Sequence, residues 1–308
     1  MTKQLLLWNS NAGKAGTINE LHQFFASRST SFIDIALETR LDARIADAAK
    51  EGCTSVIAAG GDGTIHTVVN AIMKIPSRVR PSLGILPLGT ANDLAGTLKI
   101  PDDLSLALAI IERKESTPLD VIRVRSGQFE RYFANVATGG NGSRVSAAMT
   151  DEIKKAWGAF CYLRGAVAVL SDLVSFNVSI ACDSETLTNV KAWAVLVANG
   201  KSNAGRIMIA PEASVDDGLL DLIIVLDGTA IDMVKIASSV LQGNFLESEQ
   251  VIYRKAKRVS IEAEPTMPFT LDGEIYDNAN TGGPIEFEAI RHAIQVYAAN
   301  DQTPSAQM

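Results

Sequence analysis

Cysteine is scarce in this sequence, and the few cysteines lie far apart. Among 308 residues there are three, Cys53, Cys161 and Cys182. An odd number at such spacings supports neither a disulfide framework nor a Cys-x-x-Cys metal site. The default expectation is therefore a protein of the reducing cytoplasm without structural disulfides.

Long apolar runs are also missing. The N-terminus offers only Leu5–Trp8 before polar Asn9, which is too short for the apolar region of a signal peptide. The most apolar later stretch, Trp157–Leu173, is broken by Arg164 and Asp172, and nothing approaches the roughly 18 apolar residues that span a bilayer. We expect a soluble chain that meets a membrane peripherally at most.

Positive charge is in short supply relative to negative charge. The 28 Lys and Arg against 35 Asp and Glu leave a net charge of −7, which argues against nucleic acid as a partner held through its phosphates. Aromatic residues make up 6% of the chain and hydrophobic residues 47%, an ordinary balance for a globular protein. At this length, one large or two ordinary domains are expected.

The first third of the chain alternates short apolar runs with helical patterns. The expected strands are Leu5–Trp8, Phe32–Ala36, Val56–Ala59 and Leu83–Leu86, and the expected helices are Thr17–Ser27, Leu41–Glu51 and Thr64–Met73. Thr17 followed by Glu20 fits a capping box at the start of the first helix. The rhythm predicts crossover units and a parallel sheet.

From about Asp120 the rhythm changes and strands predominate. The expected strands are Val121–Arg125, Gln128–Val136, Phe176–Cys182, Lys191–Ala198, Leu219–Val225, Val251–Ala263 and Ile285–Glu288, interrupted by helical patterns at Ser143–Trp157, Phe160–Leu173 and Thr229–Gln242. We therefore predict an α/β N-terminal domain over 1–121 and a β-rich, sandwich-like C-terminal domain over 122–308. The extreme C-terminus could return to the first domain.

The sharpest local signal is the loop Gly60-Gly61-Asp62-Gly63-Thr64, which follows an expected strand and precedes an amphipathic helix. Glycines at such a turn let backbone N–H groups close on phosphate oxygens, and the helix points its positive end at the same anion. Asp62 would repel a bare phosphate, so the loop favours a magnesium nucleotide, or a carboxylate that handles a proton.

Two rival phosphate-loop patterns fail on spacing. A dinucleotide fingerprint needs a last glycine where His66 stands. A Walker loop before Lys201-Ser202 needs a glycine where Val195 stands.

A second loop resembles Gly60–Thr64 in its position, because it directly follows an expected strand, Leu83–Leu86. It reads Pro87-Leu88-Gly89-Thr90-Ala91-Asn92-Asp93, in which Thr90 offers a hydroxyl donor. Open α/β sheets bind ligands beyond the carboxyl ends of their strands, so we expect both loops to face one nucleotide. The alternative for each loop is a purely structural turn.

Five motifs together carry a family resemblance. They are Asn11-Ala12-Gly13, Gly60-Gly61-Asp62-Gly63-Thr64, Leu88-Gly89-Thr90-Ala91-Asn92-Asp93, Ala210-Pro211-Glu212-Ala213 with Asp217-Gly218-Leu219-Leu220-Asp221, and Leu271-Asp272-Gly273-Glu274. In this order the chain resembles the diacylglycerol kinase catalytic-domain family, particularly its soluble bacterial lipid kinases, which are related to sphingosine and ceramide kinases. The first loop also occurs in NAD kinases and phosphofructokinases, so the resemblance implies a fold of that kind for the first domain.

The resemblance implies an ATP-dependent lipid kinase that transfers the γ-phosphate to a lipid hydroxyl with the help of Mg²⁺. The residues implied to contact the nucleotide are Thr39, Gly60, Gly61, Asp62, Gly63, Thr64, Ile65, His66 and Thr90. Glu274 would take the proton from the lipid hydroxyl, with Asp62 serving either as the base or in the metal network. Both are carboxylates that are ionised near pH 7, so the sequence leaves this choice open. Glu274 could instead be only a turn residue.

The same resemblance implies a structural magnesium loop over Ser214–Leu219. The carbonyls of Ser214 and Leu219 and the carboxylate of Asp217 would hold the ion, since hard oxygen ligands suit Mg²⁺. Asp217-Gly218 is also a common hairpin signal. Asp120, near the expected domain junction, is a further candidate for the catalytic metal network.

Two residues depart from the family pattern, and they keep alternatives open. Ser10 stands where proline is usual, and Thr67 stands where glutamate is often found. Because a carboxylate is missing at this position, a catalytically silent lipid-binding regulator remains one alternative. An NAD or other small-molecule kinase that shares the first loop is the other. The acceptor lipid and the oligomeric state are not predicted.

Peripheral membrane contact has two candidate surfaces. The apolar residues of Trp157–Leu173 with neighbouring lysines could lie at an interface, and the basic run Arg254–Arg258 could meet anionic head groups. The alternative is that the first is protein core and the second a solvated strand face.

Overall fold

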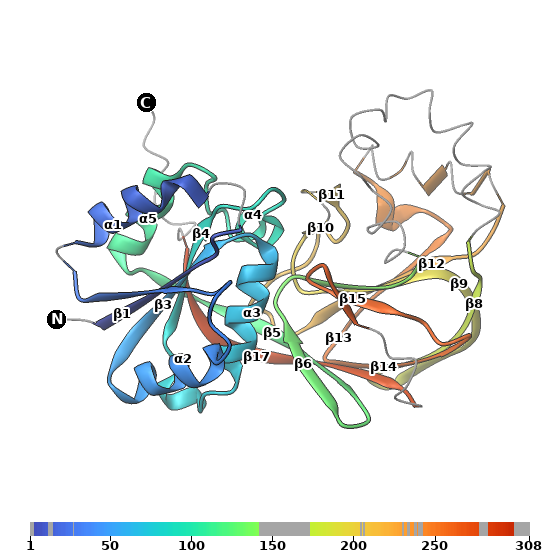
Figure 1. The fold of residues 1–308 in the computed structure, drawn as a ribbon. Coiled ribbons are helices and arrows are strands. Elements are labelled where there is room, and N and C mark those ends of the chain that lie inside the picture. Colours follow the sequence, from blue (N-terminus) through green and yellow to red (C-terminus); the bar gives the residue numbers. More distant parts are fainter. Residues whose placement is uncertain are drawn as a thin grey trace. The chain divides into compact units, whose positions relative to one another are not determined.

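The computed structural model divides the chain into two units, drawn as a ribbon in Figure 1. It describes residues 3–11, 15–26, 28–141, 173–203, 205, 207–229, 231–232, 235–236, 239, 243–276 and 283–298. Unit 1 comprises Met1–Val121, Val215–Asp217 and Ile290–Met308, and unit 2 comprises Ile122–Ser214 and Gly218–Ala289. The chain therefore passes from one unit to the other more than once.

A parallel sheet forms the centre of unit 1. Its strands lie in the order β2 (Thr30–Asp34), β1 (Lys3–Trp8), β3 (Cys53–Gly60), β4 (Ser82–Pro87) and the last part of β17 (Ile285–Tyr297), and neighbours run parallel. Trp8 lies opposite Asp34 and Ala59, and Gly60 lies opposite Pro87. The carboxyl ends of β1 to β4 therefore meet at one edge, as the alternating pattern predicts.

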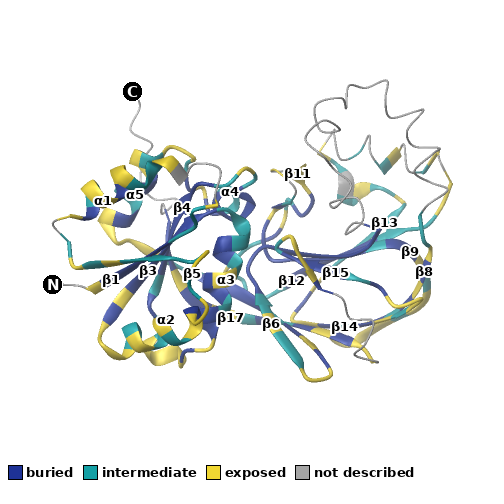
Figure 2. Ribbon diagram, viewed as in Figure 1, coloured by how far each residue is buried: buried dark blue, intermediate teal, exposed yellow. Residues whose placement is uncertain are grey.

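Helices connect these strands, and their apolar stripes are buried. They are α1 (Ile18–Phe25), α2 (Leu41–Lys50), α3 (Asp62–Met73), α4 (Asp93–Thr97) and α5 (Leu104–Arg113), with short 3₁₀ turns at Ala15–Thr17 and Ser77–Val79. Figure 2 shows β3 and β4 dark blue at the core, while α1 and α2 alternate between buried and exposed positions. In α3 the predicted stripe from Ile65 to Met73 is buried. This burial fixes the helix beneath the strand edge.

The predicted capping box at Thr17 is wrong. Thr17 has helical backbone angles, φ −76° and ψ 0°, and makes no side-chain cap hydrogen bond. The reason is that the 3₁₀ turn Ala15–Thr17 leads directly into α1, so the chain is already coiled where a cap needs an extended residue.

Unit 2 is built from antiparallel strands. They are the last part of β5 (Ser116–Ser126), β6 (Phe129–Phe133), β7 (Val136–Gly140), β8 (Phe176–Cys182), β9 (Glu185–Ala198), β12 (Leu220–Leu226), β13 (Val251–Ala256), β14 (Arg258–Glu264), β15 (Phe269–Leu271), β16 (Glu274–Tyr276) and the first part of β17, with a small pair β10 (Ser202–Asn203) and β11 (Ile207–Met208) and a 3₁₀ turn at Phe245–Glu247. The long β9 pairs with β8 through its first part and with β7 and β12 through its last part. Phe287 contacts both Phe133 and Phe269 in the core of this unit.

Several expected elements differ from the structure; among them, Lys191–Ala198 is only the last part of β9, and Val121–Arg125 lies within the longer β5. Gln128–Val136 is two strands, β6 and β7, and Val251–Ala263 is also two strands, β13 and β14. Ile285–Glu288 is only the start of β17, and Phe32–Ala36 begins two residues earlier, at Thr30. The two breaks occur where an aspartate from elsewhere in the chain binds the backbone, as described below.

Three expected helices fall wholly or largely outside the described residues. Those at Ser143–Trp157 and Phe160–Leu173 lie there, together with the apolar stripe of Trp157–Leu173. Of Thr229–Gln242, the helical residues described are 231, 232, 235, 236 and 239. Among the described residues, no helix combines the length and the apolar character that crossing a membrane requires.

Candidate functional site

The two glycine loops of unit 1 touch each other backbone to backbone. The N–H of Leu88 donates to the carbonyl of Gly60 at 2.9 Å. A Cβ atom on Gly89 would lie 2.4 Å from the Cα of Gly61, and one on Gly61 would lie 3.1 Å from the Cα of Gly89. No side chain fits between them, so glycine at both positions allows the loops after β3 and β4 to form one surface.

The start of α3 presents backbone amides at this surface. Gly61 is the N-cap, with extended angles of φ −94° and ψ −168° and no side-chain cap. The N–H of Ile65 donates to the carbonyl of Gly61 at 3.1 Å and so begins the helical bonding. The amides of Asp62, Gly63 and Thr64 precede that bond at the positive end of the helix dipole, which is the arrangement that binds phosphate.

Two of the predicted nucleotide contacts have buried side chains. Thr64 is 3% exposed and Ile65 is 2% exposed. The Thr64 hydroxyl accepts a hydrogen bond from the Asn9 amide at 3.3 Å, and a Cβ atom on Gly60 would lie 2.2 Å from it. These buried side chains pack beneath the loop. Thr64 therefore reaches the surface of the loop through its backbone.

The second loop is held by a residue that the sequence reasoning did not single out. Asn92 adopts a left-handed conformation, φ 52°, at the N-cap of α4. Its side chain accepts from the N–H of Gly89 at 3.0 Å and donates to the Gly89 carbonyl at 3.1 Å and to Asp102 at 3.2 Å. The tolerance of asparagine for left-handed angles is the signal that could have found it.

Asp62 links the two loops. Its carboxylate accepts a long hydrogen bond, 3.4 Å, from the N–H of Leu94 in α4. Because Asp62 is the first residue of α3, its charge lies at the amide end of that helix. The carboxylate is therefore held at the surface where a nucleotide phosphate is expected.

The remaining predicted nucleotide residues lie around the same sheet edge. Thr39 is exposed in the loop between β2 and α2, and Thr90 is exposed directly after Gly89. His66 is half-buried on α3, where its ring nitrogen lies 3.2 Å from the side-chain amide of Asn70. The two threonines suit ligand contact, whereas His66 has a partner on its own helix.

Ser10 and Asp34 extend this edge across β1 and β2. Asp34 accepts hydrogen bonds from the N–H of Ser10 at 3.3 Å and of Ala36 at 3.1 Å. Burial raises the pKa of Asp34, but the hydrogen bonds from Ser10 and Ala36 outweigh it, so the pKa lies below the ordinary value. Proline at position 10 could not donate this backbone bond, so the departure at Ser10 adds a contact. Thr67 bonds back to the Gly63 carbonyl at 2.9 Å.

Glu274 begins β16 in unit 2. Leu271 and Glu274 face each other across a two-residue turn in which Asp272 and Gly273 both have positive φ, 50° and 90°. This is the Asp-Gly pattern of a tight hairpin. Glu274 is exposed, while Tyr276 on the same strand is buried against Phe129. Asp62 belongs to unit 1 and Glu274 to unit 2, so which of the two carboxylates acts as the general base stays a prediction.

The candidate magnesium loop has an oxygen-rich donor set. Asp217 falls in unit 1, and Ser214 and Leu219 fall in unit 2. Among the described residues, no three His, Cys, Asp or Glu side chains cluster for a metal, so an ion here would depend on backbone carbonyls together with the one carboxylate. That chemistry fits Mg²⁺ and does not fit a thiolate- or imidazole-bound metal.

Within unit 1, the neighbours of Asp217 are tied to buried Asp120. The N–H of Asp120 donates to the Val215 carbonyl at 2.6 Å, and its carboxylate accepts from the N–H of His292 at 2.6 Å. The His292 ring contacts the Asp216 carbonyl at 3.1 Å. Asp120 thus joins the two later segments of unit 1.

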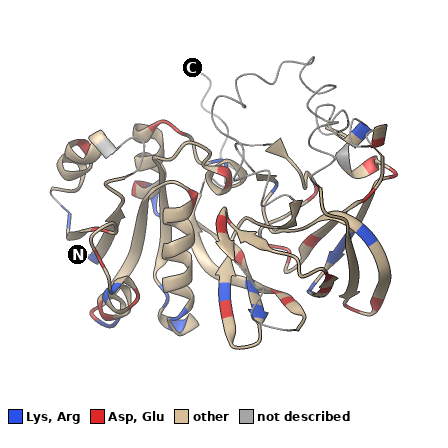
Figure 3. Ribbon diagram, turned by 45° about the vertical axis from the view of Figure 1, so that its right-hand side comes forward, with Lys and Arg blue, Asp and Glu red and all other residues tan. Residues whose placement is uncertain are grey.

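Much of the basic run at Arg254–Arg258 is engaged within unit 2. Arg254 pairs with Glu185 at 3.0 Å, and Lys255 donates to the Glu212 carbonyl at 2.7 Å. Figure 3 shows acidic and basic positions interspersed along the described elements. This favours the interpretation of the run as a strand face with partners.

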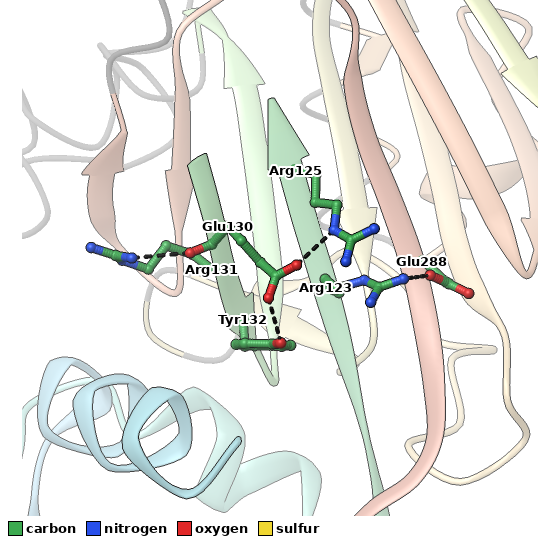
Figure 4. Close-up of polar contacts among 6 residues, drawn as sticks. All are labelled: Arg123, Arg125, Glu130, Arg131, Tyr132 and Glu288. Atoms are coloured by element: carbon green, nitrogen blue, oxygen red, sulfur yellow. Dashed lines mark hydrogen bonds and ion pairs between the residues drawn. The ribbon is translucent and has the colours of Figure 1, made fainter. Parts of the chain in front are cut away.

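Charged side chains on the hairpin β5–β6 pair with each other and with Glu288 of β17 (Figure 4). Glu130 accepts from Arg125 at 2.6 Å and from the Tyr132 hydroxyl at 2.8 Å, and Arg123 pairs with Glu288. The hydrogen bonds from Arg125 and then Tyr132 lower the pKa of Glu130. These groups stabilise one another, which makes the hairpin a structural feature.

The described cysteines have no chemical role in this site. Cys53 and Cys182 are free and buried, and burial raises the pKa of both thiols. A raised pKa disfavours the reactive thiolate. Cys161 lies outside the described residues.

Comparisons with known proteins define the class. Residues 3–124 match the family model of the diacylglycerol kinase catalytic domain, and residues 134–298 match that of the YegS C-terminal NAD kinase beta sandwich-like domain. A solved diacylglycerol kinase structure from Bacillus anthracis superimposes with a TM-score of 0.70 at 20% identity, covering 96% of this chain and 97% of that one. An NAD kinase from Archaeoglobus fulgidus gives 0.55 at 11% identity, covering 96% and 93%. The fold is thus the one shared by diacylglycerol and NAD kinases, as predicted.

A sequence relative narrows the class to a family. A diacylglycerol kinase from Staphylococcus carnosus is 32% identical over 256 residues, covering 82% of this chain and 79% of the relative. The chain belongs to the diacylglycerol kinase family. Its first domain is a catalytic domain of the lipid-kinase type, and the predicted family resemblance is confirmed.

Proposed function

We propose that this protein is an ATP-dependent lipid kinase that transfers the γ-phosphate of ATP to the hydroxyl of diacylglycerol or a related lipid alcohol. The observation that carries the proposal is the surface where the amide end of α3 meets the Gly89 loop backbone to backbone. Support for a lipid acceptor comes from the diacylglycerol kinase relatives, which match most of the chain.

In the proposed reaction, the unit 1 edge holds the nucleotide. The amides of Asp62, Gly63 and Thr64 bind phosphate oxygens, and the helix dipole stabilises their charge. The exposed hydroxyls of Thr39 and Thr90 donate further hydrogen bonds to the nucleotide. Mg²⁺ bound with ATP would neutralise charge on the β and γ phosphates, and the Asp62 carboxylate is the group at this edge that would hold it.

Glu274 is the proposed general base. Its carboxylate takes the proton of the lipid hydroxyl as the oxygen forms a bond to the γ-phosphorus, and the bond from that phosphorus to the bridging oxygen breaks so that ADP leaves. Glu274 is exposed at the start of a short hairpin strand, so a substrate can reach it. Asp62 is assigned to the metal because it lies at the phosphate-binding end of α3.

Transfer of radiolabel from γ-labelled ATP tests the reaction. Wild-type protein with Mg²⁺ should label diacylglycerol in a total lipid extract presented as mixed micelles, resolved by thin-layer chromatography. Asp62→Ala and Glu274→Ala should each reduce the rate by about 10²-fold or more. Glu262→Ala, at an exposed carboxylate of β14, is the matched control and should leave it unchanged.

Two outcomes would contradict the proposal. Label in NAD, with none in lipid, would indicate a nucleotide kinase that shares the fold. ATP binding by calorimetry without transfer to any lipid would indicate a silent lipid-binding regulator.

The magnesium loop is tested by stability. A bound ion stabilises the folded state by mass action, so millimolar Mg²⁺ without nucleotide should raise the Tm of the wild type. Asp217→Asn should abolish the rise, whereas Glu262→Asn should keep it. An equal rise in both variants would contradict the assignment of Ser214, Asp217 and Leu219.

A diacylglycerol acceptor resides in a bilayer, so the proposal implies transient contact with a membrane surface; the cytoplasm is proposed as the compartment on the separate ground of the few, widely spaced cysteines. Flotation with anionic vesicles at low salt tests this contact. Protein that stays at the bottom of the gradient under these conditions would contradict it.

A further inference from the structure

The turn directly before Glu274 is bound to a distant part of unit 2. The carboxylate of Asp272 accepts hydrogen bonds from three consecutive N–H groups, those of Ala134 at 3.1 Å, Asn135 at 2.9 Å and Val136 at 3.1 Å. The N–H of Asp272 donates to the Val136 carbonyl at 2.9 Å. Four hydrogen bonds therefore hold one residue of a two-residue turn.

The segment that binds Asp272 is itself fixed by buried amides. Asn199 is fully buried and donates from its side chain to the Ala134 carbonyl at 2.7 Å, while its N–H donates to the Asn135 carbonyl at 2.8 Å. The side chain of Asn135, 5% exposed, donates to the Ser202 carbonyl at 2.9 Å. Three hydrogen bonds from these two buried asparagines therefore hold the segment in place.

We propose that Asp272 is a positioning residue for the reaction, which acts by fixing the place of the Glu274 carboxylate; this rests on the proposed function of Glu274 as base. Only Gly273 separates the two residues, and a displaced turn moves Glu274 with it. Misplacement of a reacting group by about 1 Å can cost on the order of 100-fold in rate. A carboxylate that accepts from three amide donors makes hydrogen bonds of the strong kind, which resist such displacement.

Unit 2 contains a matched structural control. Asp183, in the turn between β8 and β9, also has a left-handed conformation, with φ 48°. Its carboxylate accepts from the N–H groups of Lys257 at 3.0 Å and Arg258 at 2.9 Å, and its N–H donates to the Arg258 carbonyl at 3.0 Å. Asp183 therefore makes the same kind of contact as Asp272 without a proposed base beyond it.

The experiment compares Asp272→Asn with Asp183→Asn in the lipid kinase assay, with Glu274→Gln measured beside them. Asparagine keeps the left-handed turn but places an amide group among N–H donors. Asp272→Asn should lower kcat by about 10- to 100-fold with the KM for ATP within about twofold. Asp183→Asn should lower Tm by a similar amount and leave kcat within about twofold. Hydrogen exchange should rise at 134–136 in the first variant and at 257–258 in the second.

Each contrary result has its own meaning. Equal losses of kcat in both aspartate variants would overturn the proposal, because a general loss of stability would then explain them. Full kcat in Asp272→Asn while Glu274→Gln is inactive would also overturn it and leave the base assignment intact. Full kcat in Glu274→Gln would overturn both the assignment of Glu274 as base and the proposal that Asp272 acts by positioning it.

A second variant covers failure of Asp272→Asn to fold. Gly273→Ala introduces a Cβ atom that meets nothing within 4 Å but strains a residue at φ 90°. It should lower kcat with the KM for ATP unchanged. An unchanged kcat would overturn the proposal.

Discussion

The sheet edge of unit 1 and the Asp272 turn of unit 2 both gather consecutive backbone N–H groups, but they satisfy them differently. At the start of α3, the N-cap is a glycine and supplies no side-chain acceptor. In unit 2 the amides of 134–136 are bound by the carboxylate of Asp272. The comparison teaches that a carboxylate bound across consecutive amides makes such a cluster structural, whereas the amides at the start of α3, where the N-cap supplies no side chain, are the ones we propose to bind phosphate.

Glycine also serves different purposes in the two regions. Gly61 and Gly89 are needed because two backbones approach too closely for a Cβ atom. Gly273 has open space around it and is needed only for its positive φ. Substitutions should therefore cause a steric clash in unit 1 and conformational strain in unit 2.

The largest effect is expected from Gly89→Ala. The new methyl group would lie 2.4 Å from the Cα of Gly61 and 2.8 Å from the Asn92 carboxamide oxygen, so the loops must separate. We expect ATP affinity by calorimetry to fall by about 100-fold or more and the free energy of unfolding to fall by about 1–3 kcal/mol.

Gly16→Ala is the control for this substitution. A Cβ atom there meets nothing within 4 Å, so both quantities should stay at the wild-type values. ATP affinity that survives Gly89→Ala would break the comparison, because close approach of the loops would then not matter for binding.

A moderate effect is expected from Thr64→Val, which keeps the shape and removes the hydroxyl bonded to Asn9. Loss of one buried hydrogen bond should reduce the free energy of unfolding by about 1 kcal/mol. ATP affinity should change by less than about threefold, because the backbone amide is retained. Denaturant unfolding and calorimetry measure the two effects; a large loss of affinity would make the hydroxyl itself a ligand group.

The smallest effect is expected at Glu130. Its carboxylate, like that of Asp272, is bound by groups of the same unit, but the Arg125–Glu130 pair is partly exposed to solvent. Because the hydrogen bond from Arg125 lowers the pKa of folded Glu130 below 4.5, the stabilisation is present above that pH and is lost as the pH falls below it. Glu130→Gln should lower Tm at pH 7 by less than about 2 °C. The difference from wild type should shrink as the pH falls below 4.5 in scanning calorimetry; a constant difference would contradict the role of ionisation.

The order of elements in unit 1 and the place of its two glycine loops could be predicted because both depend on local signals. Apolar runs and helical stripes predict β1 to β4 and α1 to α3, and glycines after two of the strands predict the site edge. The short α4 and the helix α5 were not predicted. α5 begins at an aspartate cap, Asp103, and ends at left-handed Lys114, which is a weaker signal than glycine.

The breaks in the strands of unit 2 could not be predicted, because they depend on residues far away in the sequence. The gap between β6 and β7 coincides with the amides bound by Asp272, and the gap between β13 and β14 coincides with those bound by Asp183. Both stretches have continuous strand-forming character. The role of buried Asn199 likewise becomes visible only when the chain is folded.

The return of the chain to unit 1 has a consequence for biosynthesis. Val296 pairs with Leu83 at the edge of β4, Ala293 accepts from Arg80, and the hydroxyl of Tyr297 meets that of Ser55 at 2.7 Å. When the first 121 residues have left the ribosome, the sheet of unit 1 still lacks its last strand, the end of β17. The edge of β4 therefore stays unpaired until the residues around Val296 have been translated.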